Sequence, residues 1–182
     1  MERYVAFLRG MNLGGRRIKN DELRAEFEEL GFADVATFRA SGNVIFAAGD
    51  ESESALVRRI EEGLGEALGY EVPVYLRSCA EVAAMAAREP FDAKLIEASQ
   101  GKLQVSLLLD EPSAKDRKAV LALATDEDRL AIEGRELFWL PSGGLLESAL
   151  DLKAIEAIVG VDTRRTKGTI DQIALKLGDL PG

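Results

Sequence analysis

Histidine is absent from this chain of 182 residues, and Cys79 is its only cysteine. The missing histidine excludes histidine acid–base catalysis, histidine-activated nucleophiles and the usual zinc sites built from Cys and His. One cysteine cannot form an intrachain disulfide. Any catalysis would have to use carboxylates, Lys, Tyr, Ser, Thr or a hard metal ion. The pattern predicts no catalytic residue, metal or cofactor, and it leaves open whether the chain is an enzyme.

Long apolar segments are also missing. The start, "MERYVAFLRG", has an acid at Glu2 and an apolar run too short for a signal peptide, and no later segment approaches the ~20 apolar residues of a membrane span. Apolar residues make up 47% and charged residues 30%, which is typical of a folded globular protein. We therefore expect a cytoplasmic protein that does not span a membrane.

Positive charge is scarce. The chain has 23 Lys and Arg against 32 Asp and Glu, a formal net charge of −9. Long-range repulsion of this sign opposes non-specific binding to nucleic acid or to an anionic membrane. A local basic segment could still hold a small anion.

The first half predicts the order strand–helix–strand–strand–helix–strand. We expect strands at Tyr4 to Arg9, "VATFR", "NVIFA" and "EVPVYLR", with one helix capped by Asn20 and ended before Gly31 and a second opened by an Asp50–Glu53 capping box. A third helix, opened by Ser78 and Glu81, follows these elements.

The second half repeats this order with a gap. "LQVSLLL" predicts a strand, Ser113 caps a helix, "RLAIEGRELFWL" predicts a hairpin that turns at Gly134, and a helix ends at Gly160. The closing strand is not evident, "GVDTRR" being a weak candidate, and Thr169 opens a last helix. We expect an α+β fold of two tandem ferredoxin-like (βαββαβ, α/β-plait) subdomains with antiparallel sheets, residues 1–98 and 99–182, the second less complete and with an extra C-terminal helix.

The segment "LRGMNLGGRRIKN", residues 8–20, has two adjacent glycines and four basic side chains without one acid. It is close to the P-loop pattern, but Arg17 stands where Ser or Thr should bind magnesium, and the helix starts only near Asn20. This disfavours a nucleoside triphosphatase. Backbone amides could instead form a nest, with Arg9, Arg16 or Arg17 as bidentate donors. The alternative is a glycine turn with solvated basic side chains.

A second acid-free stretch, residues 35–49, contains "SGN". In a ferredoxin-like sheet the end of strand one lies beside the start of strand three, so the glycine loop should approach Ser41, Gly42 and Asn43. A shared polar hollow is one interpretation, and a simple hairpin turn is the other. A third basic segment, "TRRTKGT" before the last helix, favours a solvated loop over an anion site.

The first two segments and the C-terminal one resemble the bacterial family called domain of unknown function 1697, whose L-R-G-I-N-V-G-G loop and T-x-x-x-S-G-N-V-x-F hairpin appear in register. "TRRTKGTI" partly matches its T-x-R-N-W-x-T motif, with Thr166 and Lys167 in place of Asn and Trp. If that Asn and Trp contact a ligand in the family, the resemblance implies a different ligand or affinity here. The resemblance implies paired ferredoxin-like subdomains and no established activity. Its pattern carries over to Arg9, Gly10, Asn12, Gly14, Gly15, Ser41, Gly42, Asn43, Arg165 and Thr169.

The leading hypothesis is a cytosolic module that binds a small anion, such as a phosphorylated metabolite. Arg9 and Arg16 would be the charge partners, the amides of Gly14 and Gly15 would donate, and Ser41 and Asn43 would orient the ligand. One alternative is a protein interaction module that docks through its open apolar sheet face. The other is single-stranded RNA binding, which the missing RNP1 pattern and the negative charge disfavour. Whether the chain is a monomer or a homodimer stays open.

Two further features have mainly structural interpretations. Glu133 and Glu136 bracket the predicted hairpin turn, which favours a solvated cross-strand pair over an acid–base couple. Cys79 starts a capped helix, where a thiol pKa can fall, but a small buried hydrophobe is the commoner role.

Overall fold

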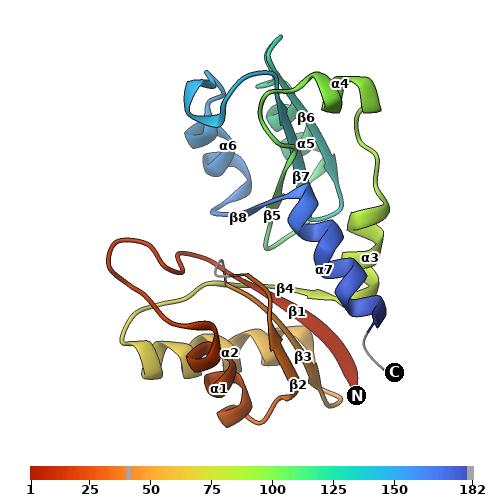
Figure 1. The fold of residues 1–182 in the computed structure, drawn as a ribbon. Helices are drawn as coiled ribbons and strands as arrows, with labels where there is room; N and C mark the ends of the chain where they lie inside the picture. The colour runs from red at the N-terminus through yellow and green to blue at the C-terminus, as the bar shows by residue number, and fades with distance from the viewer. Residues whose placement is uncertain (40–41, 180–182) are drawn as a thin grey trace. The chain divides into compact units, whose positions relative to one another are not determined.

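The structure, a computed structural model, describes residues 1–39 and 42–179. The chain forms two compact units, Met1–Val82 and Ala83–Gly182, and each is considered by itself. The fold is mixed α+β, with two four-stranded antiparallel sheets and seven α-helices in the described residues (Figure 1). In this described part, no helix combines the length and apolar character that crossing a membrane requires. The expected domain boundary between residues 98 and 99 stays a prediction.

The first unit builds its sheet in the order β2-β3-β1-β4, with every neighbouring pair antiparallel. Its elements are β1 (Glu2–Leu8), α1 (Asn20–Glu29), β2 (Ala33–Thr37), β3 (Asn43–Ala48), α2 (Glu53–Leu68) and β4 (Val74–Ser78). Because β1 lies between β3 and β4, it is an inner strand. The loop that follows it therefore leaves the sheet between the ends of its two neighbours.

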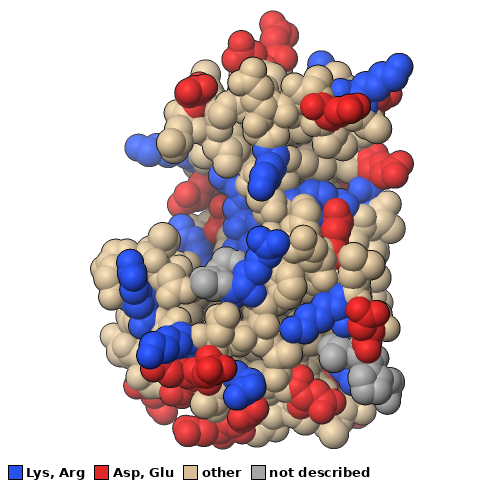
Figure 2. Space-filling view, viewed as in Figure 1, with Lys and Arg blue, Asp and Glu red and all other residues tan. Residues whose placement is uncertain are grey.

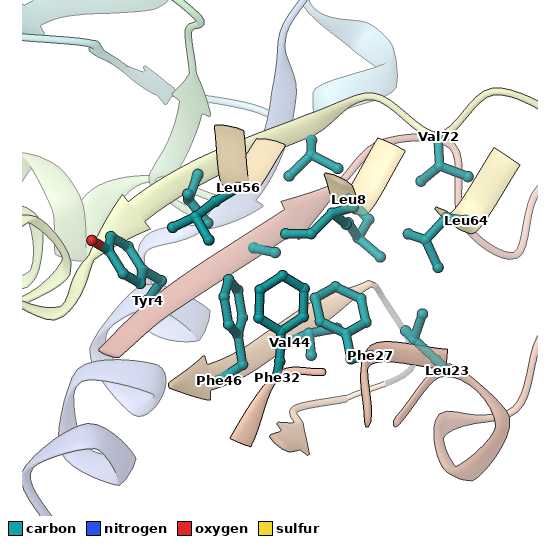
Figure 3. Close-up of a cluster of buried hydrophobic side chains, with 14 of the residues drawn as sticks. Tyr4, Leu8, Leu23, Phe27, Phe32, Val44, Phe46, Leu56, Leu64 and Val72 are labelled. Atoms are coloured by element: carbon teal, nitrogen blue, oxygen red, sulfur yellow. The ribbon is translucent and has the colours of Figure 1, made fainter. Parts of the chain in front are cut away.

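The core of the first unit lies between this sheet and the helices α1 and α2, which cover one of its faces (Figure 1). Alternate residues of β1, Tyr4, Ala6 and Leu8, point into it, as the period of two in a strand requires. Phe27 of α1 packs with Phe32 and Phe46, ring centroids 4.5 to 5.8 Å apart (Figure 3). This aromatic cluster fixes α1, and with it the loop that precedes α1, against the sheet.

Local capping signals were predicted with mixed success. The Ser78–Glu81 capping box is confirmed: the Ser78 N–H donates to Glu81 Oε2 at 2.8 Å, and the Glu81 N–H donates to Ser78 Oγ at 3.2 Å. The expected box at Asp50 is wrong, because Ser52 caps α2 by accepting from the Ala55 N–H. Asn20 is the first residue of α1, and Lys19 is its N-cap.

The second unit has the same strand arrangement, in the order β6-β7-β5-β8. Its elements are the end of α3 (Cys79–Ala87), α4 (Ala93–Ala98), β5 (Gln104–Leu107), α5 (Ala114–Leu121), β6 (Asp128–Glu133), β7 (Glu136–Pro141), a short 3₁₀ helix (Leu145–Glu147), α6 (Leu152–Val159), β8 (Thr163–Thr166) and α7 (Lys167–Asp179). The Gly134 hairpin, the Ser113 cap and the helix end at Gly160 are confirmed.

The expectation of a less complete second sheet is wrong. Strand β8 pairs antiparallel with β5 over four residues and supplies the missing fourth strand. The predicted loop "TRRTKGT" is therefore strand followed directly by helix, and α7 begins at Lys167 rather than at Thr169. Thr166 takes the capping role, since its hydroxyl accepts from the Thr169 N–H at 3.2 Å.

Two polar features brace the second unit. The buried Asp128 carboxylate accepts hydrogen bonds from Trp139 Nε1 at 2.7 Å and from Ser148 Oγ at 2.8 Å. Arg88 pairs with Glu133 at 2.9 Å and with Glu136 at 2.6 Å. Glu133 and Glu136 are thus joined by one guanidinium and are not a solvated pair. Arg88 is more than forty residues from both in sequence, so the local pattern could not reveal this contact.

Candidate functional site

The loop between β1 and α1 is held in a defined shape by its own contacts. The Ile18 N–H donates to Asn12 Oδ1 at 3.2 Å, which closes the segment between these two residues. Asn12 has a φ of +60°, a conformation that asparagine tolerates better than most residues. Gly14 and Gly15 follow at +59° and +83°, so this pair makes the tight turn that the sequence indicated.

Arg16 extends from this turn onto the connection between α2 and β4. Its guanidinium carbon lies 4.5 Å from the centre of the Tyr70 ring, a cation–π arrangement. The Arg16 N–H donates to the carbonyl oxygen of Leu13 at 3.0 Å. The loop is thereby attached to the body of the unit between its two ends.

The glycine loop and the β2–β3 hairpin do converge. The Leu8 N–H donates to the carbonyl oxygen of Gly42 at 2.7 Å. Gly42 has a φ of +72°, and a Cβ atom placed there would lie 2.7 Å from Met11 Cγ and 3.1 Å from Leu8 Cβ. Only glycine fits this close approach without movement of the neighbouring chain.

Asn43, next to Gly42, is bonded within the hairpin. Asn43 is 1% exposed, and its side-chain amide donates to the carbonyl oxygen of Phe38 at 2.9 Å across the hairpin. Ser41 lies outside the described residues. The contact between Asn43 and Phe38 is therefore the kind of hairpin contact that the interpretation of "SGN" as a simple turn predicts.

An open hollow of about 740 Å³ lies where the glycine loop meets the start of α1. The described residues that line it are Asn12, Arg17, Ile18, Lys19, Asn20 and Glu22. They include neither Gly42 nor Asn43, so the hollow belongs to the first loop and α1 rather than to both loops. Among the described residues that the sequence offered for a ligand site, Asn12 and Arg17 contribute to its wall.

The walls of the hollow combine two cations, two carboxamides and one carboxylate. Neither Arg17 nor Lys19 forms an ion pair with a residue in the described ranges, whereas Arg3, Arg24 and Arg59 of the same unit all do. The Glu22 carboxylate accepts from the Lys19 N–H at 3.0 Å. Figure 2 shows Lys and Arg side chains over this loop and Asp and Glu side chains over the helices beside it.

The charge-partner role that the sequence predicts for Arg9 and Arg16 stays a prediction. Arg9 is exposed at the end of β1, where its N–H donates to the carbonyl oxygen of Pro73 at 3.0 Å, and Arg16 lies on Tyr70. Neither belongs to the hollow's lining, and nor do Gly10, Gly14 and Gly15. The lining residues Arg17 and Lys19 lie in the same sequence segment, and Glu22 follows it closely. Their placement around one hollow depends on the position of α1, which the sequence does not show.

The two predicted C-terminal residues lie in the second unit. Arg165 is buried on β8, where its guanidinium donates to Thr163 Oγ1 at 2.9 Å, and burial lowers its pKa to about 10. The Thr169 hydroxyl shares a hydrogen bond with that of Thr166 at 3.0 Å. Lys167 Nζ donates to the carbonyl oxygen of Ala86 at 2.7 Å, so both departures from the family motif make structural contacts here.

Two observations concern metal ligands and the thiol in the part of the chain that the structure describes. No three His, Cys, Asp or Glu side chains gather there in a group that could hold a metal ion. Burial raises the pKa of the Cys79 thiol above its usual value, so the lowered pKa considered for a helix start is wrong. Cys79 is protonated at neutral pH.

Comparison with known proteins agrees with the sequence motifs. Residues 1–138 match the model of the family described as "Protein of unknown function (DUF1697)". The chain belongs to this family. The DUF1697 match includes the glycine loop, the hairpin with Gly42 and the whole of the hollow.

The chain is also similar to a solved structure, that of the conserved bacterial protein SP0830 from Streptococcus pneumoniae. The TM-score is 0.72 with 19% sequence identity, and the match covers 98% of this chain and 99% of that one. At this identity the likeness shows a common fold. No curated protein is significantly similar in sequence.

Proposed function

We propose that this protein binds a small anionic ligand, such as a phosphorylated metabolite, in the hollow between the glycine loop and α1. The observation that carries the proposal is the pairing of Arg17 and Lys19 in one hollow without an ion pair to a described residue. Two cations that line one hollow together balance the charge of about −2 on a phosphate monoester.

The remaining residues of the hollow support the same conclusion. Asn12 and Asn20 bring carboxamides, which donate and accept hydrogen bonds, and Ile18 brings an apolar surface. A mostly rigid site costs less entropy on binding. The Asn12–Ile18 hydrogen bond and the Arg16–Tyr70 contact provide this rigidity before a ligand arrives.

The strand order supports a further proposal about the fold. Both units follow the order β-α-β-β-α-β and place their first strand between the third and the fourth. We propose that each is a ferredoxin-like plait, in which the loop after the first strand is a natural position for a ligand site.

Calorimetric titration with glucose 6-phosphate and with pyrophosphate tests the binding proposal. An Arg17→Gln, Lys19→Gln double variant should lose at least about tenfold in affinity for whichever probe binds, since two charge-assisted contacts are removed. A Lys115→Gln, Lys118→Gln variant makes the same change in net charge on exposed residues of α5 and should bind like the wild type. Absence of binding by the wild type, or equal affinity in both variants, contradicts the proposal.

A further inference from the structure

Glu22 gives the hollow a second, negative wall. Its Oε2 accepts from the Lys19 N–H at 3.0 Å, which fixes the carboxylate beside the cationic part of the lining. Like Arg17 and Lys19, Glu22 forms no ion pair with a residue in the described part of the chain. The lining therefore carries two positive charges and one negative charge, held on a short stretch of loop and the first turn of α1.

A carboxylate in this place acts on the ligand in two ways. It can only accept hydrogen bonds, so it favours a hydroxyl group or another donor close to the bound anion. It also repels further negative charge brought into the same hollow. Arg17 and Lys19 match the charge of about −2 on a phosphate monoester, and any additional charge would face Glu22.

We infer that the ligand is a sugar phosphate, a single phosphate ester with free hydroxyl groups, and that Glu22 is the residue that selects it against polyphosphates. This inference rests on the proposed function. Arg17 and Lys19 hold the phosphate, Glu22 accepts from a sugar hydroxyl, and the carboxamide of Asn20 takes a further hydroxyl group. Ile18 offers an apolar surface to the carbon atoms of the sugar.

The test compares two probes, glucose 6-phosphate and pyrophosphate, on the full chain. The wild type should bind glucose 6-phosphate at least about tenfold more tightly than pyrophosphate. Glu22→Gln should weaken glucose 6-phosphate binding and strengthen pyrophosphate binding, each by about three- to tenfold, because a neutral amide neither repels the second phosphate nor accepts as strongly. Glutamine can still serve the first turn of a helix at this position, so α1 should remain folded.

Glu29→Gln is the matched control, with the same change of charge at an exposed position on α1 beyond the hollow. It should leave the ratio of the two affinities unchanged. If both probes depend on Arg17 and Lys19 but Glu22→Gln leaves their ratio as in the wild type, the inference about Glu22 is wrong and the anion site stands. If neither probe binds the wild type, the site and the inference both fail.

Discussion

The Arg16 guanidinium lies over the ring of Tyr70, 4.5 Å from its centre, and so joins the tip of the glycine loop to the connection between α2 and β4. Arg17, the next residue, lines the hollow. The Arg16–Tyr70 contact therefore positions the segment that brings Arg17 to the proposed ligand.

Replacing Tyr70 should loosen this segment and weaken the proposed ligand site. A cation–π contact near the surface contributes about 0.5 to 1 kcal/mol, so Tyr70→Leu should lower the affinity for glucose 6-phosphate by about two- to fivefold in a calorimetric titration. Tyr70→Phe keeps an aromatic face for Arg16 and should bind like the wild type. Equal losses in both variants would mean that the contact does not position the loop.

Gly42 should be the least replaceable glycine of the two converging loops. In Gly42→Ala, alanine must adopt the positive φ of this position, where it is strained, and its Cβ atom would lie 2.7 Å from Met11 Cγ. The free energy of unfolding should therefore fall by about 2 to 4 kcal/mol. Gly14→Ala has a similar φ but nothing within 4 Å of the added atom, and it should cost about 1 kcal/mol. Urea unfolding measures both, and a smaller loss for Gly42→Ala than for Gly14→Ala would contradict the close approach.

The Asp128 carboxylate should hold the second unit together from within. Asp128→Ala leaves Trp139 Nε1 and Ser148 Oγ without their acceptor, and the free energy of unfolding should fall by about 2 to 4 kcal/mol. Fluorescence of Trp139, the chain's one tryptophan, follows this unfolding directly. Asp110→Ala, at an exposed position, should change stability by less than about 0.5 kcal/mol. A similar effect of both variants would rule out a supporting role for the network.

Cys79 should react slowly in the folded protein, because burial raises the pKa of its thiol. The rate of iodoacetamide alkylation, read by mass spectrometry, should reach half its maximum at a higher pH in the folded chain than in urea. Since the unfolded chain loses this proton first, the free energy of unfolding should fall as pH rises through the ordinary thiol pKa. Cys79→Ser should remove that part of the pH dependence. A folded-state midpoint below that of the unfolded chain would contradict the stated burial.

Local patterns predicted much of the fold, and contacts distant in sequence account for most of the differences. The Ser78–Glu81 box depends on residues three apart, so the sequence contains its whole cause. Strand β8, in contrast, has the sequence "TRRT", which has no apolar alternation, and it forms because β5 offers a free edge to pair with. The sequence offered only "GVDTRR" as a weak candidate, and its last three residues are the first three of β8.

The site shows the same limit. The glycine loop stands out in the sequence, because two glycines and four basic residues occur there without an acid. Which of those cations share a hollow depends on where α1 packs, and the core around Phe27 sets that position. The convergence of Gly42 on Leu8 and Met11 was predicted from topology, whereas the lining of the hollow by Arg17 and Lys19 was not.

The most direct test of an anion site between the glycine loop and α1 is a nuclear magnetic resonance titration of ¹⁵N-labelled protein with inorganic phosphate. The account predicts saturable shifts at the backbone amides of Asn12 and of residues 17–20 and at the Arg17 side-chain Nε. Shifts that appear only in residues 83–179, or no saturable shift at any phosphate concentration at which the protein stays folded, would contradict it.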